Sequence, residues 1–142
     1  MTLEELQELA DKDLKINDVE LDLESLKTPQ LHNKYCKFLN KFKTLQKQAE
    51  IDYNRLMKEK WEYYTGKADP ATYQAKPFNL KILKQDVDKY IQADEDIIRS
   101  PQKLSYLNTV VDYLDRTSRL ISNRGFTIKN AIDWKKFMGG VI

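Results

Sequence analysis

One segment of the chain, residues 55–67, interleaves cationic and aromatic side chains. Cations neutralise the phosphates of a nucleic acid and release its counterions. Aromatic rings stack on unpaired bases without regard to base sequence. Together these are the two requirements of sequence-independent binding to single strands. The candidate DNA contacts in this segment are Arg55, Lys58, Lys60, Tyr63, Tyr64 and Lys67.

The same segment has a second interpretation. Its aromatic side chains, Trp61 among them, can instead belong to the core or to an interface beside a solvated lysine surface, because aromatic residues are more often buried than used for stacking. Two further cations near the C-terminus, Arg124 and Lys129, are candidate DNA contacts on charge alone. The basic surface is extended along the same predicted helix by Lys34, Lys37, Lys41, Lys43 and Lys47.

Residues that carry enzymatic chemistry are sparse. The glycines form no G-x-x-x-x-G-K phosphate loop. His32 and Cys36 lie four residues apart and can touch on a helix, but a nucleophile–base pair also needs an orienting group and an oxyanion site. The acidic run 94–96 is more typical of a helix start than of a magnesium site. We therefore expect no enzyme, no metal site and no cofactor.

The element that must position the DNA-binding segment is a long helix. Thr28 and Pro29 are the residue types of an N-cap and a first helical position, and Gly66 is typical of the residue just past a helix C-terminus. The pattern predicts a basic helix over residues 28–66, helical from about 29 to 65. Its apolar positions between Leu31 and Ala49 alternate spacings of four and three, as in a coiled-coil seam.

Two segments flank this helix. Residues 1–27 form an acidic N-terminal segment, in which Thr2 and Glu5 have the spacing of a capping box and predict a short helix. Residues 67–80 contain Pro70 and Pro77 and are predicted to be a loop or arm.

Residues 81–142 are predicted to be a helical region that oligomerises. Ser100 and Pro101 repeat the signal of a helix start, Gly125 is expected to close that helix, and Thr127 is expected to cap a last one. Its apolar seam needs a helical partner. Either other subunits or the long helix, in an intramolecular hairpin or bundle, can supply it. The seam residues predicted for oligomerisation are Leu104, Leu107, Val111, Leu114 and Ile121.

Composition limits the fold class. No segment alternates like a strand, and four Gly and four Pro in 142 residues are too few for a β-sandwich or barrel. We expect one all-α domain, residues 1–142. The single cysteine cannot form an internal disulfide. No run of about 18 apolar residues is present, and the acidic start lacks a signal-peptide core, so we expect a cytosolic protein without a membrane span.

The net charge of +2 hides an asymmetry. Residues 1–28 hold nine acidic and three basic side chains, whereas residues 29–67 hold nine basic and four acidic ones. An acidic head on a basic body suits three partners: a polyanion, a basic protein or a second copy of the chain. A membrane-surface helix is disfavoured, because acids such as Glu59 and Glu62 interrupt the basic face.

Three blocks of the chain resemble the UvsY family, the recombination mediators of T4-like phages. Residues 57–66 read MKEKWEYYTG, residues 93–96 read ADED, and residues 122–129 read SNRGFTIK, with Asp133 and Phe137 in step behind them. The resemblance runs from about Leu3 to Met138. The three blocks occur in the family's order over a similar total length.

The resemblance implies a fold and a function. It implies a protein that binds single-stranded DNA, assembles into a cyclic homo-oligomer (a hexamer or heptamer) and works in the cytoplasm of the phage's host. It implies that the protein helps a RecA-like recombinase to displace the phage single-strand DNA-binding protein. The family's DNA-binding cations would fall on Lys58 and Lys60, and Lys60 stands where the better-known member has arginine.

From these observations we expect a recombination mediator without enzymatic activity. Its oligomer would hold single-stranded DNA through phosphate contacts, in a conformation that the recombinase prefers. The alternative is a helical scaffold or adaptor that binds proteins only.

Overall fold

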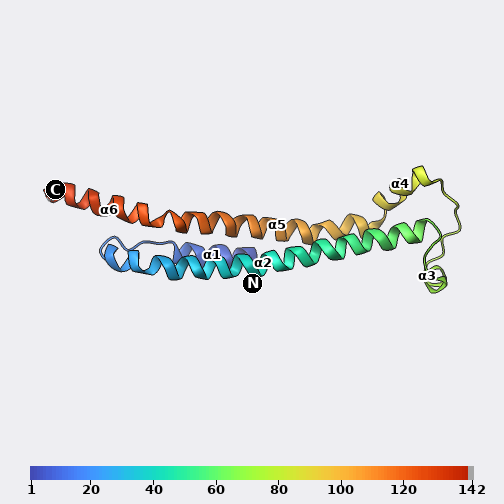
Figure 1. Ribbon diagram of the computed structural model, residues 1–142, viewed down its shortest axis with the longest axis horizontal. Coiled ribbons are helices and arrows are strands. Elements are labelled where there is room, and N and C mark those ends of the chain that lie inside the picture. The colour runs from blue at the N-terminus through green and yellow to red at the C-terminus, as the bar shows by residue number, and fades with distance from the viewer. Residues whose placement is uncertain (141–142) are drawn as a thin grey trace. The chain divides into compact units, whose positions relative to one another are not determined.

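The computed structural model describes residues 1–140, and within them the chain is all-α, as the sequence predicts. The chain divides into two compact units. The first unit contains residues 1–43 and the described residues from 109 onward, and the second unit contains residues 44–108. In chain order the helices are α1 (Leu3–Asp13), α2 (Leu21–Tyr64), α3 (Pro70–Ala75), the short 3-10 helix η1 (Lys84–Asp86), α4 (Val87–Gln92), α5 (Glu95–Ser122) and α6 (Arg124–Met138) (Figure 1).

The predicted capping box at the start of α1 is confirmed. The backbone amide of Glu5 donates to Thr2 Oγ1 at 3.1 Å, and the amide of Thr2 donates to Glu5 Oε2 at 2.9 Å. These two hydrogen bonds satisfy amides that a helix start leaves without an intrahelical acceptor.

The start of α2 differs from the expectation. The helix begins at Leu21 and contains Pro29, so Thr28 is not its N-cap. A proline inside a helix removes one backbone hydrogen bond. Tertiary contacts support the turns before Pro29, because the Arg124 side chain donates to the backbone carbonyl and the carboxylate of Glu24 and, at 2.9 Å, to Thr28 Oγ1. These contacts come from a part of the sequence that local capping rules do not consider.

The end of α2 agrees with the prediction. The helix stops at Tyr64, and Gly66 has a φ of +77°, in the left-handed region that favours glycine. The amide of Lys67 donates to the carbonyl of Glu62 at 2.8 Å, and that of Gly66 donates to the carbonyl of Tyr63 at 3.3 Å. This pair of bonds is the Schellman arrangement, which turns the chain away from the helix.

Helices α5 and α6 also begin earlier than expected. Helix α5 begins at Glu95 and continues through Pro101, because Asp94 occupies the capping position and accepts a hydrogen bond from the amide of Asp96 at 2.9 Å. Helix α6 begins at Arg124, so Gly125 does not close a helix and Thr127 is not a cap.

In the first unit, α1 and α6 are both tied to α2. Asp13 at the end of α1 accepts hydrogen bonds from Lys34 Nζ at 2.7 Å and from the Tyr35 hydroxyl at 2.9 Å. Burial and this hydrogen bond raise the pKa of Tyr35 above its ordinary value. On α6, Arg124 binds Glu24 of α2. The buried apolar side chains of this unit are Leu6, Ala10, Leu21, Tyr35, Leu39, Phe42, Val110, Leu114, Ile121 and Ile128.

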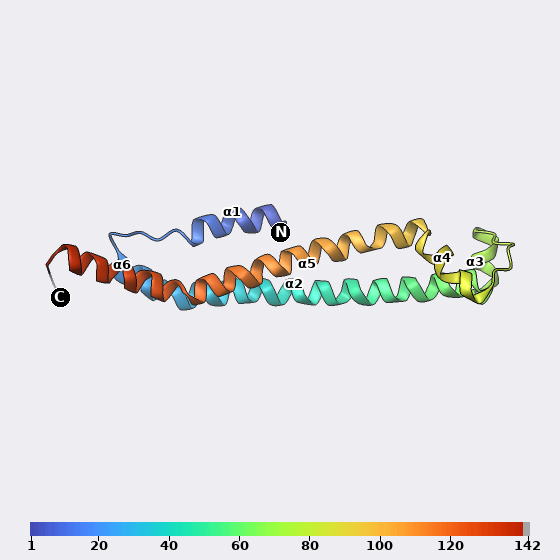
Figure 2. The same cartoon turned by 90° about the horizontal axis from the view of Figure 1, so that it is seen from above.

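In the second unit, segments of α2 and α5 run antiparallel (Figures 1 and 2). Gln46 donates to Asn108 at 2.6 Å, whereas Lys60, further along α2, reaches back to Asp96 at the start of α5. A core cluster closes this end of the unit and holds the last turns of α2 in place. It consists of Val87, Ile91 and Ile97, with Leu56, Met57, Tyr64 and Ile82 packed against them.

The predicted oligomerisation seam of α5 needs a correction. Leu107 is buried in the second unit, and Leu114 and Ile121 are buried in the first. Leu104 and Val111 are half-buried. Three of the five seam residues are therefore covered within a single chain and do not offer a surface to another subunit. For them the intramolecular alternative is the correct one.

Candidate nucleic-acid interface

The last turns of α2 carry Lys58 and Lys60, the two lysines on which the family's DNA-binding cations would fall. The two side chains have different surroundings. Residues two apart on a helix lie roughly 200° apart around its axis, so Lys58 and Lys60 face nearly opposite directions. The Lys58 side chain is 77% exposed, and its ammonium lies 3.8 Å from the carboxylate of Glu62, one turn further on. The Lys60 side chain is 13% exposed. Only Lys58 is presented to solvent.

Lys60 is held by the start of α5. Its ammonium lies 3.2 Å from Asp94 Oδ2 and 2.8 Å from Asp96 Oδ2. Asp94 also accepts a hydrogen bond from the Tyr64 hydroxyl at 2.7 Å. The acidic run therefore serves the start of α5, as expected, and is also a partner for α2.

Electrostatics stabilise this network in its ionised form. Burial alone would lower the pKa of Lys60, but its hydrogen bonds to the two aspartates outweigh burial and raise that pKa. Burial alone would raise the pKa of Asp94, yet the hydrogen bonds that its carboxylate accepts hold the pKa below its ordinary value. Burial and the bond to Asp94 raise the pKa of the Tyr64 hydroxyl. A phosphate that recruits Lys60 must compete with both aspartates.

Tyr63 and Tyr64 are structural, which corrects their assignment as DNA contacts. Tyr63 is 6% exposed, stacks on Tyr73 with ring centroids 5.5 Å apart, and donates to the carbonyl of Lys76 at 3.0 Å. Tyr64 packs edge-on against Phe78 at 5.1 Å. Their rings build the junction between α2 and the segment around α3, where Tyr63 is buried and Tyr64 is half-buried.

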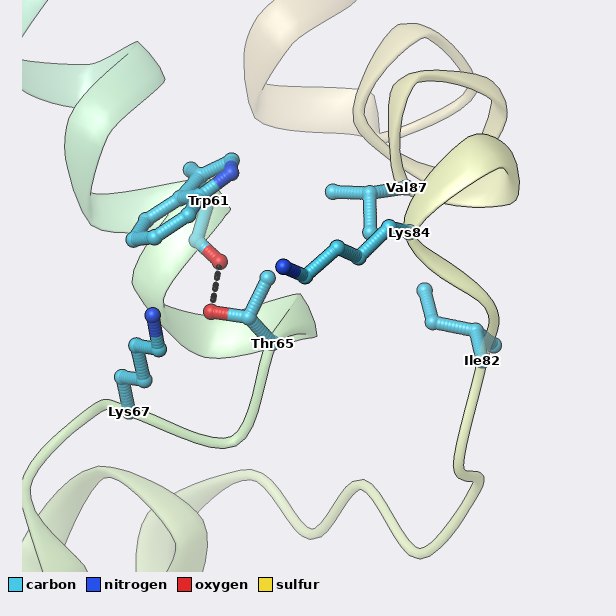
Figure 3. A pocket seen from close by; sticks show the side chains of 6 residues that line it. All are labelled: Trp61, Thr65, Lys67, Ile82, Lys84 and Val87. Atoms are coloured by element: carbon cyan, nitrogen blue, oxygen red, sulfur yellow. Dashed lines mark hydrogen bonds between the residues drawn. The ribbon is translucent and has the colours of Figure 1, made fainter.

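Trp61 behaves differently from the two tyrosines. It is 43% exposed, and Lys67 Nζ lies over its ring, 4.5 Å from the centroid. Its indole borders a cavity of about 320 Å³ (Figure 3). The cavity is lined by Trp61, Thr65, Lys67, Ile82, Lys84 and Val87.

Lys84 is a cation of this region that sequence reasoning missed. It lies at the start of η1, outside the basic helix, and chain folding brings it to the cavity opposite α2. No local motif marks it, since its role depends on the turn that follows Gly66. Among the predicted cations, Arg55, Lys58, Lys60 and Lys67 share the second unit with Lys84.

Arg124 and Lys129 belong to the first unit. The Arg124 side chain is 4% exposed and pairs with the Glu24 carboxylate. A hydrogen bond from Lys27 and the pairing with Arg124 outweigh burial and hold the pKa of Glu24 below its ordinary value. Arg124 is thus a buried structural cation, which corrects its assignment as a DNA contact, whereas Lys129 is exposed on α6.

The other reactive side chains have local partners. Cys36 Sγ lies 3.7 Å from His32 Nδ1, so the pair touches as its spacing predicts.

Among residues 1–140, none of the helices has the length and apolar character that a membrane span requires.

Comparison with known proteins gives concordant findings. A family model described as "Recombination, repair and ssDNA binding protein UvsY" matches residues 9–141. The "Recombination protein uvsY" of Enterobacteria phage T4 is 28% identical over 143 residues, which cover 99% of each chain. Two crystal structures of the bacteriophage T4 recombination mediator protein UvsY match this fold. One has a TM-score of 0.83 at 26% identity and covers 98% of both chains. The other has a TM-score of 0.78 at 25% identity and covers 97% of this chain and 99% of that one.

Proposed function

The chain belongs to the UvsY family of recombination, repair and single-stranded-DNA-binding proteins, and from this premise we propose that it is a recombination mediator. It binds single-stranded DNA covered by the phage single-strand DNA-binding protein and promotes loading of a RecA-like recombinase there, in the cytoplasm of the phage's host. It catalyses no reaction of its own. The match to a T4 protein that carries the name recombination mediator supports this role.

The observation that carries the proposal is the exposed cationic surface at the end of α2. Arg55 and Lys58 are exposed on neighbouring turns, and Lys67 is exposed three residues after the end of the helix. Such cations bind phosphates whatever the base sequence is. A protein that acts along a whole strand needs binding of this kind. Lys60 takes a secondary part, because its ammonium already has two carboxylate partners.

Mediation follows from selective binding. A protein that binds one DNA conformation better than another shifts the population towards that conformation and needs no nucleotide hydrolysis of its own. If the bound conformation is the one that the recombinase also prefers, the mediator lowers the cost of assembling the recombinase on the strand.

We propose that the mediator works as a homo-oligomer and that α6, in place of the α5 seam, supplies the contact. Phe126, Trp134, Phe137 and Met138 are all exposed on α6. Several copies that grip one strand gain avidity, because each bound site raises the effective concentration of DNA at the next.

The test measures binding to a short single-stranded oligonucleotide across a salt series. For Lys58→Ala we expect the salt dependence of log K to flatten by about 0.7 per site, the value for one lost phosphate contact on a single strand. Lys47→Ala is a matched control, because Lys47 is also exposed on α2 and also faces a carboxylate, Glu50, at 3.7 Å. The control should change the slope less.

Two outcomes contradict the proposal. Equal slopes for the wild type and Lys58→Ala would remove Lys58 from the interface. A wild-type protein that ignores the oligonucleotide even at low salt would favour the adaptor that binds proteins only. Recombinase-dependent ATP hydrolysis on DNA coated with single-strand-binding protein then tests loading itself, and the wild type should shorten its lag phase.

A further inference from the structure

We infer that the cavity beside Trp61 is a subsite for one unpaired base of single-stranded DNA, with Lys67 and Lys84 contacting the flanking phosphates. This inference rests on the proposed function and adds a base-stacking contact to it. Neither Trp61 nor Lys84 is among the DNA contacts predicted from the sequence.

The walls of the cavity suit a flat apolar ring. The half-exposed indole of Trp61 forms one side, and the aliphatic side chains of Ile82 and Val87 line the other (Figure 3). The volume of about 320 Å³ is at the small end of ligand pockets. It therefore suits a single base better than a larger ligand. Aromatic stacking holds any base, because every base has a π-face.

The charges around the cavity suit an anion attached to that ring. The lining residues include two lysines and no acid. Within residues 1–140, neither Lys67 nor Lys84 has a carboxylate within 4.0 Å, whereas Lys58 and Lys60 both do. The Thr65 hydroxyl is turned toward α2, where it donates to the carbonyl of Trp61 at 2.7 Å (Figure 3). A nucleotide has the required combination of a flat ring and neighbouring negative charge.

In the proposed complex, a DNA base replaces the Lys67 ammonium on the ring of Trp61. Without DNA, the Lys67 ammonium lies over the indole, in a cation–π contact that is weak at an exposed site. An entering base takes that face of the ring, and the ammonium moves to a phosphate. Lys58 lies one turn before Trp61, roughly 60° away around α2, so the strand can continue from the cavity along the exposed cations of the helix.

The experiment separates base contacts from phosphate contacts. Binding of an oligothymidine is compared with binding of an abasic sugar–phosphate strand of the same length and charge. For the wild type we expect the oligothymidine to bind more tightly. Trp61→Ala should reduce that preference by about tenfold, equivalent to about 1.4 kcal/mol, which lies in the range of base–aromatic stacking.

Two variants keep the result interpretable. Trp61→Phe retains an aromatic face and should keep most of the preference. Tyr106→Ala removes an aromatic side chain that is exposed on α5, outside the lining of the cavity, and should leave the ratio of the two affinities unchanged. A Lys67→Ala/Lys84→Ala pair should flatten the salt dependence by about 1.4 for both strands alike.

The outcomes distinguish this inference from the proposed function. If the wild type binds both strands and Trp61→Ala retains the full base preference, the subsite is wrong and the DNA-binding function stands. If the wild type binds the two strands equally, the subsite is also wrong. If it binds neither strand, both proposals fall. Loss of the preference in Trp61→Ala alone, with an unaltered thermal midpoint, supports the subsite.

Discussion

Asp94 gathers more partners than any other carboxylate at the end of α2. Its side chain is 3% exposed and accepts hydrogen bonds from Tyr64, from the amide of Asp96 and from Lys60. A buried charge costs free energy unless it is paired and hydrogen-bonded, and here both carboxylate oxygens accept from a donor. This one side chain therefore joins α2 to the start of α5 and fixes where Lys60 points.

The pKa of Asp94 leads to a prediction about acid stability. Because the folded-state pKa lies below the ordinary value of 3.8, the unfolded chain binds more protons near that pH. Stability is therefore complete above 3.8 and is lost as the pH falls through the folded pKa. In urea unfolding, Asp94→Asn should lower the free energy of unfolding by about 1–3 kcal/mol at pH 7. Between pH 5 and pH 2, the free energy of unfolding of this variant should fall by less than that of the wild type.

A surface carboxylate supplies the control for this prediction. Asp112 is exposed and pairs with Arg116 on its own helix, at 3.1 Å, and such surface pairs contribute little to stability. Asp112→Asn should follow the wild-type curve. An Asp94→Asn curve parallel to the wild type at every pH would show that Asp94 does not stabilise the fold through its charge.

At the scale of elements, helix ends could be predicted from the sequence where the cap is local. Thr2 and Gly66 act within a few residues of themselves, and both predictions are confirmed. Pro29 and Pro101 were misleading, because each lies inside a helix whose earlier turns are supported by distant or side-chain contacts. A proline marks the first turn of a helix only where nothing stabilises helical turns before it. Here Arg124 supports the turns before Pro29, and Asp94 caps the turns before Pro101.

Gly66 and Gly125 give a paired prediction about the two kinds of helix glycine. Gly66 has a φ of +77°, which a side chain disfavours, so Gly66→Ala should destabilise the chain by about 1 kcal/mol. Gly125 lies inside α6, and a methyl group there meets no atom within 4 Å. Gly125→Ala should stabilise the chain by about 0.5–1 kcal/mol. Thermal unfolding of both variants checks the opposite signs, and equal signs would contradict the assigned backbone roles.

The buried pair of Arg124 and Glu24 gives a prediction about how α6 is held on α2. Both side chains are under 8% exposed, so Arg124→Met leaves the buried carboxylate without its buried partner, although Lys27 still pairs with it at 3.1 Å, and should cost about 1–3 kcal/mol. Adding Glu24→Leu should recover part of that loss, and a double-mutant cycle in urea measures the coupling. The salt dependence of DNA binding should not change in the folded variant, because Arg124 does not face solvent. Additive losses would contradict the pairing.

At the scale of the whole molecule, the sequence pattern predicts the fold class and the family, whereas the exposed faces of the helices depend on packing. The helical periodicity was enough to predict an all-α chain, and the three short blocks were enough to identify its family. Which face of each helix stays exposed could not be predicted, because the apolar seam of α5 is the same string of residues whether a subunit or α2 covers it. Leu114 and Ile121 are buried within the chain, whereas α6 has exposed apolar side chains. We therefore expect self-association through α6.

The exposed apolar side of α6 leads to a prediction about assembly. At roughly 100° per residue, Phe126, Trp134, Phe137 and Met138 fall within about 120° of each other, on the side away from the buried Ile128. The Trp134 and Phe137 rings pack together at 5.6 Å and remain exposed. Contiguous exposed apolar patches mark interaction sites. We therefore expect Trp134→Ser/Phe137→Ser to reduce the mass in sedimentation equilibrium towards 16.8 kDa, the mass of one chain.

Assembly and DNA affinity should fall together in that variant. Its Lys58 and Trp61 belong to the second unit and are unaltered, so each single site keeps its strength, while the avidity of several sites on one strand is lost. Affinity for a long oligonucleotide should drop far more than affinity for one short enough to occupy a single site. A matched change on the exposed side of α5, Leu120→Ser, should alter neither the mass nor the affinity. If the α6 variant keeps the wild-type mass, the contact between copies lies on another surface, and an unchanged preference for long strands would confirm that conclusion independently.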